Sequence, residues 1–312
     1  MKLNDDIWIF GNKYLSKNDK NFISHLRTIP LFTYRTGFNC IYPTELDSDV
    51  GWGCMIRSGQ MMAAHCLIQC ILDDDWRLDD NIEETNHINI LKKFNDNADC
   101  TYSIHNICTV ASYMGVPIGS WFSPTITSLS LELINNEEDN SSLNIIVFQD
   151  GIIEKDKIVK STDLNKKTLI LLPIMFGLNN ISDKYINVLL KLFEFKLFTG
   201  IVGGKPNTSM YFVGKSDRNL LYLDPHNVKF YKNKSCYKEN ITGKINFLPV
   251  NDLDPSMVLG FLVKSSDDID VLYEYVNKCF NNIDFPICFG SKKNIENIEF
   301  HKKEGDWELI SQ

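Results

Sequence analysis

The chain has 312 residues, 44% of them hydrophobic, which suits one large domain or one domain with a small appendage. Its formal net charge of −8 and pI near 5.3, without a basic cluster, argue against a nucleic-acid or anionic-membrane binder. The N-terminus lacks an apolar core of signal-peptide length, and Pro173 and Gly177 interrupt the longest apolar run, so we expect a cytoplasmic protein without a transmembrane segment.

Cysteine usage indicates free thiols. The nine cysteines are an odd number in a chain without a secretion signal, which favours a reducing compartment over a disulfide framework. No Cys-x-x-Cys pair is present, and Cys100, His105 and Cys108 supply at most three metal ligands. We therefore expect neither a metal nor a cofactor.

The first half of the chain is predicted to be mainly helical. The first 30 residues should form a short ordered lead that docks on the body, followed by a strand-like run over 31–35. Apolar residues at helical spacing predict an amphipathic helix from about Cys54 to Asp73. Residues 73–100 are polar and at most helical. Further helices are expected over 104–114 and 124–134.

The second half alternates strands and helices. Strands are expected over 143–148, 169–174, 210–214, 220–224 and 246–250. Helices are expected over 182–195 and 269–279. The charged stretch 150–164 should belong to a small protruding lobe, and the glycine-rich stretch 200–207 should be a loop.

Cys54 follows a Gly-Trp-Gly turn and lies at the expected start of its helix. Unpaired backbone N–H groups and the positive end of the helix dipole favour an anion there, so this thiol should ionise easily. Gly51 and Gly53 can take positive φ and leave room above the sulfur for a substrate backbone. The alternative is a buried small hydrophobic side chain, as we expect for Cys66 and Cys70.

Asp224-Pro225-His226 ends the strand 220–223 and suits an acid–base pair. Residues two apart on an extended chain point to the same side, so the carboxylate and the imidazole should lie together. The carboxylate would fix the tautomer of the ring and stabilise the imidazolium, which leaves the other ring nitrogen to accept a thiol proton. The alternative is an ordinary turn after a strand.

Eight sequence blocks together resemble the autophagins, papain-like cysteine proteases that process the ubiquitin-like, GABARAP-type modifier of autophagy. The matching blocks are Phe32–Arg35, Ser48–Gln60, Gly119–Phe122, Gly203–Asn207, Tyr211–Phe212, Tyr222–His226, Leu253–Ser256 and Gly260–Phe261. The resemblance implies an α+β papain-like fold with a small inserted lobe. It also implies a protease domain over 1–290, with the lobe near 145–168, and a flexible tail over 291–312.

The resemblance further implies the role of each site residue. Cys54 would be the nucleophile, His226 the general base and then acid, Asp224 its orienting group, and Tyr34 an oxyanion-hole donor beside the Cys54 N–H. The order Cys, Asp, His differs from papain, where the orienting residue follows the histidine. A gate over the groove would be formed by Trp121 and by the loop residues Gly203, Gly204, Pro206 and Asn207.

The segment Glu304–Ile310 contains an aromatic residue, Trp307, two residues before Leu309 and three before Ile310, preceded by acidic residues. This pattern, with Trp307 and Ile310 as its anchors, resembles the short motif that binds autophagy modifiers by adding a strand to their sheet. The alternative is a terminal aromatic that packs on the body.

The expected function is thus cleavage of the modifier after its C-terminal glycine and its release from phosphatidylethanolamine, by a monomer acting transiently at membranes. Two alternatives remain. One is a papain-like protease of another ubiquitin-like tail, and the other is a catalytically weak modifier-binding protein.

Overall fold

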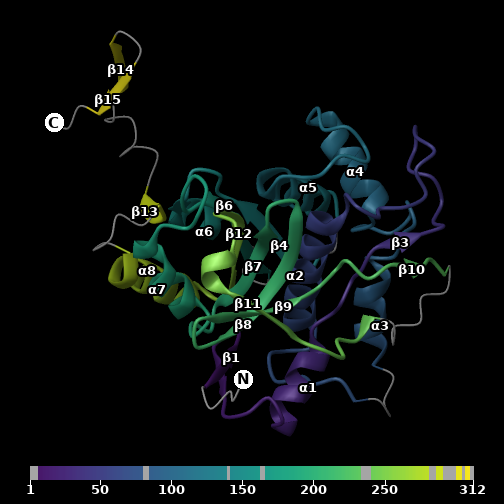
Figure 1. The fold of residues 1–312 in the computed structure, drawn as a ribbon, viewed down its shortest axis with the longest axis horizontal. Helices are drawn as coiled ribbons and strands as arrows, with labels where there is room; N and C mark the ends of the chain where they lie inside the picture. The colour runs from purple at the N-terminus through teal and green to yellow at the C-terminus, as the bar shows by residue number, and fades with distance from the viewer. Residues whose placement is uncertain are drawn as a thin grey trace.

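The computed structural model describes residues 6–79, 84–138, 141–161, 166–232, 240–280 and 286–290, and the backbone of 300–303 and 306–309. A nine-stranded sheet forms the centre of the molecule, with strand order β11-β9-β8-β7-β12-β6-β4 (Figure 1). Strand β1 extends the sheet by pairing with β8, and β2 pairs with β1. The strands of this sheet are β1 Ile7–Ile9, β2 Asn12–Tyr14, β4 Leu143–Val147, β6 Lys167–Met175, β7 Phe198–Lys205, β8 Thr208–Ser216, β9 Asn219–Leu223, β11 Asn246–Pro249 and β12 Ser256–Val263.

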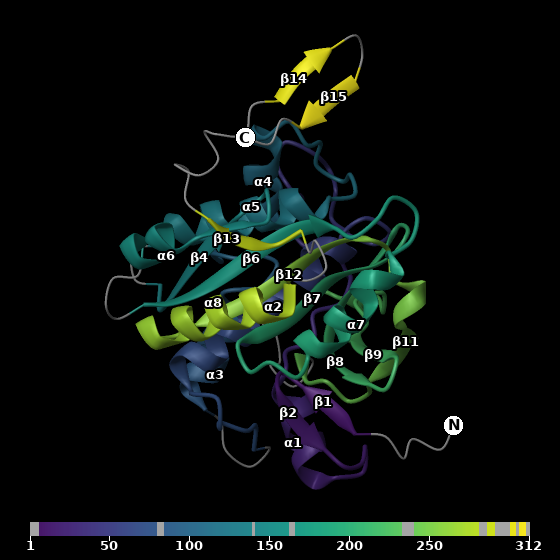
Figure 2. The same cartoon turned by 90° about the vertical axis from the view of Figure 1, so that its left-hand side faces the viewer.

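Helices cover both faces of the sheet (Figures 1 and 2). Their bounds are α1 Lys20–Thr28, α2 Cys54–Ile71, α3 Thr85–Lys92, α4 Ile104–Tyr113, α5 Pro124–Asn136, α6 Lys155–Ser161, α7 Asp183–Leu192 and α8 Ser266–Phe280. Three short strand pairs complete the described structure: β3 Arg35–Thr36 with β10 Lys229–Phe230, β5 Ile152–Glu154 with β13 Cys288–Gly290, and β14 Phe300–Lys303 with β15 Asp306–Leu309.

The sheet separates two hydrophobic cores because successive side chains of a strand point to opposite faces. In β6, Leu169 and Leu171 belong to the core shared with α2, whereas Ile170 and Leu172 belong to the core shared with α7 and α8. Helix α2 packs on β7 and β8 and is buried over most of its length. The start of α2 is therefore fixed relative to the ends of these strands.

The structure confirms the four helices expected after residue 100, and it confirms the β8–β9 hairpin. Two expectations are wrong. Residues 200–205 are not a loop but the second part of strand β7, because their glycines allow close approach of the neighbouring chain. The run 31–35 is not a strand, since only Arg35–Thr36 pairs in this region.

The first 30 residues contain the β1–β2 hairpin and α1, which the sequence did not predict as separate elements. The segment 145–168, expected as an inserted lobe, comprises the end of β4, then β5, α6 and the first residues of β6. Strands β4 and β6 are parallel neighbours in the main sheet, so β5 and α6 lie in the connection between them.

Gly260→Ala should lower the free energy of unfolding by about 1–3 kcal/mol, because overpacking a dense core is destabilising. A Cβ at Gly260 would lie 2.3 Å from Oγ1 of Thr199 and 2.6 Å from Sδ of Met62, on β7 and α2. Gly243→Ala is the control, since nothing lies within 4 Å of its added Cβ. Equilibrium urea unfolding measures both, and equal midpoints for the two variants would contradict the tight packing of α2 on β12.

Candidate active site

Cys54 is the first residue of α2, and its thiol is buried. No described side chain caps this helix, whose N-cap is Gly53. The positive end of the α2 dipole therefore acts directly on the sulfur. The turn before it has Gly51 at φ +87°, as expected.

Gly53 does not use the positive φ that glycine allows, since its φ is −82°. Gly53 is required for space instead. A Cβ there would lie 2.3 Å from Oδ2 of Asp49, so the glycine makes room for this buried carboxylate next to the start of α2.

Asp224 and His226 form the expected pair at the end of β9. The Oδ1 atom of Asp224 accepts hydrogen bonds from Nδ1 of His226 at 2.6 Å and from its backbone N–H at 3.0 Å. The hydrogen bond that His226 donates to Asp224 is the largest cause that raises the pKa of His226, and the interaction with Cys54 is the second. Together they raise this pKa to about 9. The same bond from His226 lowers the pKa of Asp224, so the carboxylate stays ionised.

Cys54 and His226 influence each other strongly. Burial alone raises the pKa of Cys54. Four groups act in the opposite direction and lower the pKa overall: the His226 side chain, the Ser209 backbone and the side chains of Trp121 and Tyr34. Nε2 of His226 is buried and makes no well-formed hydrogen bond to a described residue. Cys54 and His226 shift each other's pKa toward the charged forms, so the two groups are suited to form a thiolate–imidazolium pair.

Tyr34 packs edge-on against His226, with ring centroids 5.4 Å apart and planes at 89°. Its backbone N–H donates to the Pro225 carbonyl at 2.8 Å, and its carbonyl accepts from the Lys229 N–H at 3.0 Å. Burial and then Cys54 raise the pKa of the Tyr34 phenol. The phenol consequently keeps its proton and can donate a hydrogen bond beside the sulfur.

Trp121 covers the sulfur, and its Nε1–H donates to Sγ of Cys54 at 3.3 Å. The indole is 39% exposed, so it lies between the thiol and solvent. A cavity of about 260 Å³ begins beside it, between the start of α5 and the β7–β8 turn. Among the residues that line this cavity are Gly204, Pro206 and Asn207.

The glycines of the expected gate are close-packed rather than free. A Cβ at Gly204 would lie 1.9 Å from the Thr208 carbonyl oxygen, and a Cβ at Gly203 would lie 2.9 Å from Cβ of Met257. The unusual backbone angle belongs to Asn207, at φ +60°, in the two-residue turn with Pro206. Any movement of this hairpin must therefore occur at its tip, because Gly203 and Gly204 are paired with β8.

The side chains of the two tail candidates are outside the described structure. Trp307 belongs to β15, of which only the backbone is described, and Ile310 lies outside the described residues. His105 contacts the Asn39 carbonyl through Nε2 at 2.6 Å. The described residues include no cluster of His, Cys, Asp or Glu suited to a metal ion.

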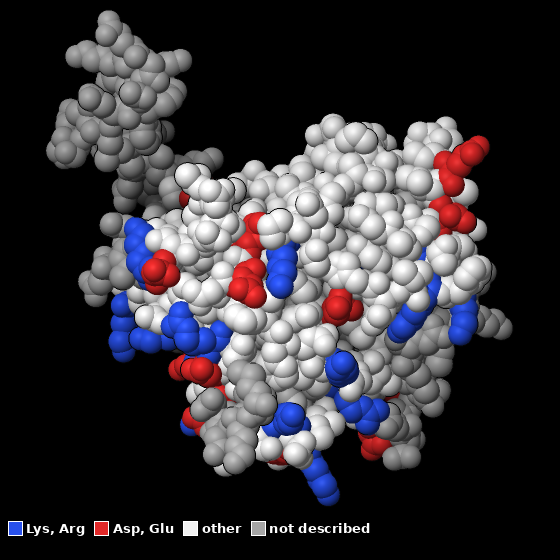
Figure 3. All heavy atoms as spheres, in the orientation of Figure 1, with Lys and Arg blue, Asp and Glu red and all other residues white. Residues whose placement is uncertain are grey.

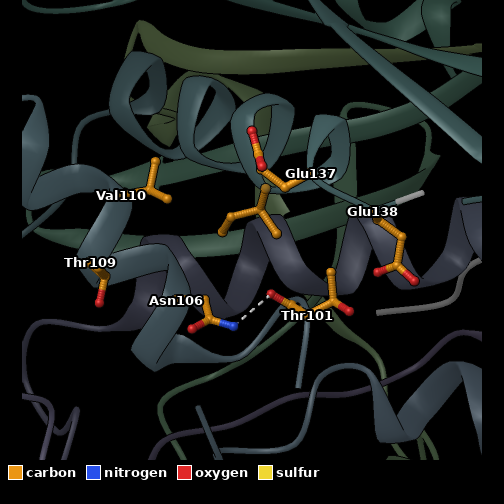
Figure 4. Close-up of a pocket in the computed structure, with 7 residues that line it drawn as sticks. Thr101, Asn106, Thr109, Val110, Glu137 and Glu138 are labelled. Atoms are coloured by element: carbon orange, nitrogen blue, oxygen red, sulfur yellow. Dashed lines mark hydrogen bonds between the residues drawn. The ribbon is translucent and has the colours of Figure 1, made fainter. Parts of the chain in front are cut away.

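A second cavity, of about 470 Å³, lies between α4 and α5 (Figure 4). Several of its polar side chains interact with other residues of the chain. Asn106 donates to the carbonyls of Ala98, Cys100 and Thr101, and Glu138 pairs with Lys93 at 2.5 Å. This cavity contains none of the side chains expected for catalysis.

Within the described residues, no helix is both long enough and apolar enough to span a bilayer. On the face shown in Figure 3, basic and acidic side chains of the described residues are interspersed and do not form one basic patch.

Sequence reasoning missed a buried ion-pair network at the start of α2. Arg57 donates to Asp49 through Nε at 2.8 Å and to Asp96 through Nη1 at 2.7 Å. The signal was present, because an arginine in an otherwise apolar helix needs a buried partner. The identity of that partner depends on the fold, since Asp96 is remote from Arg57 in sequence.

The chain matches the Peptidase C54 catalytic domain over residues 19–275. It belongs to this family, the autophagins. Similar relatives include the cysteine protease ATG4B of Xenopus laevis, 29% identical over 88% of this chain and 80% of the relative. The cysteine protease ATG4A of Pongo abelii is 30% identical over 87% of this chain and 78% of its own length. The probable cysteine protease ATG4 of Coccidioides immitis is 35% identical over 71% of this chain and 54% of its own length.

This membership confirms the expected family, the α+β papain-like fold and the enzyme class. This chain is therefore an autophagy-related cysteine protease.

His226→Ala should move the pH midpoint for alkylation of Cys54 upward. Loss of the imidazole removes the strongest contribution that opposes burial, so the thiol would ionise at higher pH than in the unmodified protein. The rate of modification by iodoacetamide, followed at Cys54 by mass spectrometry over a pH series, measures this midpoint. Trp121→Phe removes only the indole donor and should give a smaller shift in the same direction. An unchanged midpoint in His226→Ala would contradict the thiolate–imidazolium pair.

Proposed function

We propose that this autophagin cleaves the ubiquitin-like, GABARAP-type autophagy modifier after its C-terminal glycine. The observation that carries the proposal is the meeting of one buried thiol with an imidazole, a protonated phenol and an indole. Family membership supports the enzyme class, and the narrow, covered approach to the sulfur supports a substrate tail that ends in glycine.

The proposed reaction has two acyl-transfer steps. The Cys54 thiolate attacks the glycine carbonyl carbon, and the resulting oxyanion accepts hydrogen bonds from the Tyr34 hydroxyl and the Cys54 N–H. The C–N bond then breaks as His226 gives its Nε2 proton to the leaving amine, which leaves a thioester. His226 next takes a proton from water as the water attacks the thioester, and the thiolate departs.

Asp224 serves both steps through His226. Its hydrogen bond to Nδ1 fixes the ring so that Nε2 faces the sulfur, and its negative charge stabilises the imidazolium that exists before the amine leaves and forms again when water attacks the thioester. Because the pKa of His226 is raised to about 9, the ring carries the proton needed by the leaving amine at neutral pH.

The same steps apply when the leaving amine is phosphatidylethanolamine, since this conjugate is also an amide of the terminal glycine. We therefore extend the proposal to release of the modifier from that lipid. In both reactions Trp121 must leave the sulfur, and the substrate tail would pass between the indole and the turn at Pro206 and Asn207.

Cys54→Ala and His226→Ala should abolish cleavage of a tagged modifier precursor. Tyr34→Phe removes one oxyanion donor and should lower kcat by roughly 10²–10³-fold with little change in KM. Gel or fluorescence assays at matched enzyme concentrations measure these rates, with circular dichroism to confirm folding. Cleavage that persists in Cys54→Ala would refute the mechanism. Rapid cleavage of other ubiquitin-like precursors, but not of this one, would favour the alternative substrate class.

The segment around Trp307 and Ile310 is proposed as a second contact with the modifier, through strand addition. Replacing both residues by alanine should raise KM for the modifier precursor and leave kcat unchanged, because the motif would recruit substrate without touching the reacting atoms. Alanine at Leu15, whose side chain is exposed on the body, is the matched control. An unaltered KM in the double variant would remove this contact from the proposal.

A further inference from the structure

Asp49 connects the two segments that supply the proposed oxyanion donors. Its Oδ1 atom accepts the backbone N–H of Arg35, the residue after Tyr34, at 2.6 Å. Its backbone carbonyl accepts the N–H groups of Trp52 and Gly53, at 3.2 and 2.9 Å, in the turn that leads into Cys54. One fully buried residue thus holds the Tyr34 segment and the start of α2 at a fixed separation.

The other oxygen of Asp49 is fixed from inside α2. Oδ2 accepts from Nε of Arg57 at 2.8 Å, and both side chains are almost completely buried. The carboxylate therefore has one oxygen on the Tyr34 segment and one on the nucleophile helix. It cannot rotate without breaking a hydrogen bond to one of them.

Asp96 provides an internal comparison. It accepts from Nη1 of Arg57 at 2.7 Å and is also buried, so it supports the same arginine. The hydrogen bonds described for Asp96 do not reach the Tyr34 segment. Both Asp49 and Asp96 therefore stabilise the buried Arg57 side chain. Of the two carboxylates, Asp49 alone also accepts a described hydrogen bond from the Tyr34 segment.

We propose that Asp49 is a positioning residue for the oxyanion hole, which acts by holding the Tyr34 hydroxyl and the Cys54 N–H at the spacing that one oxyanion requires. This inference rests on the proposed function for the roles of Tyr34 and Cys54. The charge of Asp49 also helps to raise the pKa of Tyr34, which keeps that donor protonated. Displacement of either donor by a fraction of an ångström weakens both hydrogen bonds at the transition state.

The test compares two reactions of the same sulfur. Acylation by 4-nitrophenyl acetate passes through a tetrahedral oxyanion, whereas alkylation by iodoacetamide displaces iodide at a saturated carbon and forms none. Both reactions need the Cys54 thiolate, so a change in the thiolate fraction cancels in the ratio of their rates. The ratio therefore measures how well the oxyanion is stabilised. It is measured in the unmodified protein, Asp49→Asn and Asp96→Asn, after subtraction of the rates in Cys54→Ala, together with kcat and KM for the modifier precursor.

Asp49→Asn should lower the acylation-to-alkylation ratio and kcat by about 10- to 100-fold, with KM little changed. Asp96→Asn should lose stability in a similar way but keep the ratio of the unmodified protein. An unchanged ratio in Asp49→Asn, or equal losses in the two variants, would overturn the proposal. If the unmodified protein fails to cleave the precursor, the proposed substrate is wrong, while the ratio still decides the role of Asp49.

Gly53→Ala gives a second route if Asp49→Asn does not fold. The added Cβ would lie 2.3 Å from Oδ2 of Asp49 and so displaces the carboxylate without removing its charge. The same loss of ratio is expected, and a normal ratio in a folded Gly53→Ala protein would count against positioning by Asp49.

Discussion

The burial of the Cys54 thiol is the constraint on which the rest of the site depends. A thiol without water around it resists ionisation, so the fold must surround it with groups that favour the anion. The start of α2 contributes its dipole, and His226 and Trp121 contribute hydrogen-bond donors. The sheet makes this possible because α2 packs on β7 and β8, whose neighbour β9 ends directly before Asp224 and His226.

The two faces of the sheet differ in the groups that pack on them. The α2 face carries the nucleophile helix, the Tyr34 segment and the start of α5, so every proposed reacting group lies on it or at its edge. The opposite face, under α7 and α8, is packed mainly with apolar side chains. Rigid strands matter here because hydrogen bonds to a transition state lose strength with small displacements.

Cys54, Asp224 and His226 could be predicted as candidates from local sequence, whereas Tyr34 and Trp121 came only from the resemblance to the autophagins, and the fold that assembles them was predictable only in part. Asp224 and His226 lie two residues apart on an extended chain, so their pairing follows from strand geometry alone. The glycine-rich stretch ending at Asn207 was misjudged, because glycine permits both flexible loops and tightly packed strands, and only the neighbours distinguish them. The partners of Arg57 likewise required the tertiary structure, since Asp96 is distant in sequence.

Trp121 links access to the sulfur with the reactivity of the sulfur. Its indole donates to the thiolate and also covers it, so a substrate that displaces the indole removes one of the groups that lower the pKa of Cys54. Loss of this donor would raise the pKa of Cys54, and the intrinsic nucleophilicity of a thiolate rises with its pKa. Solvent reaches the sulfur least while the gate is closed, which protects an easily oxidised thiolate between reactions. On the proposal that Trp121 is part of a gate, a tail that binds without moving the indole would find the sulfur covered, so opening the gate would at the same time change the reactivity of the sulfur.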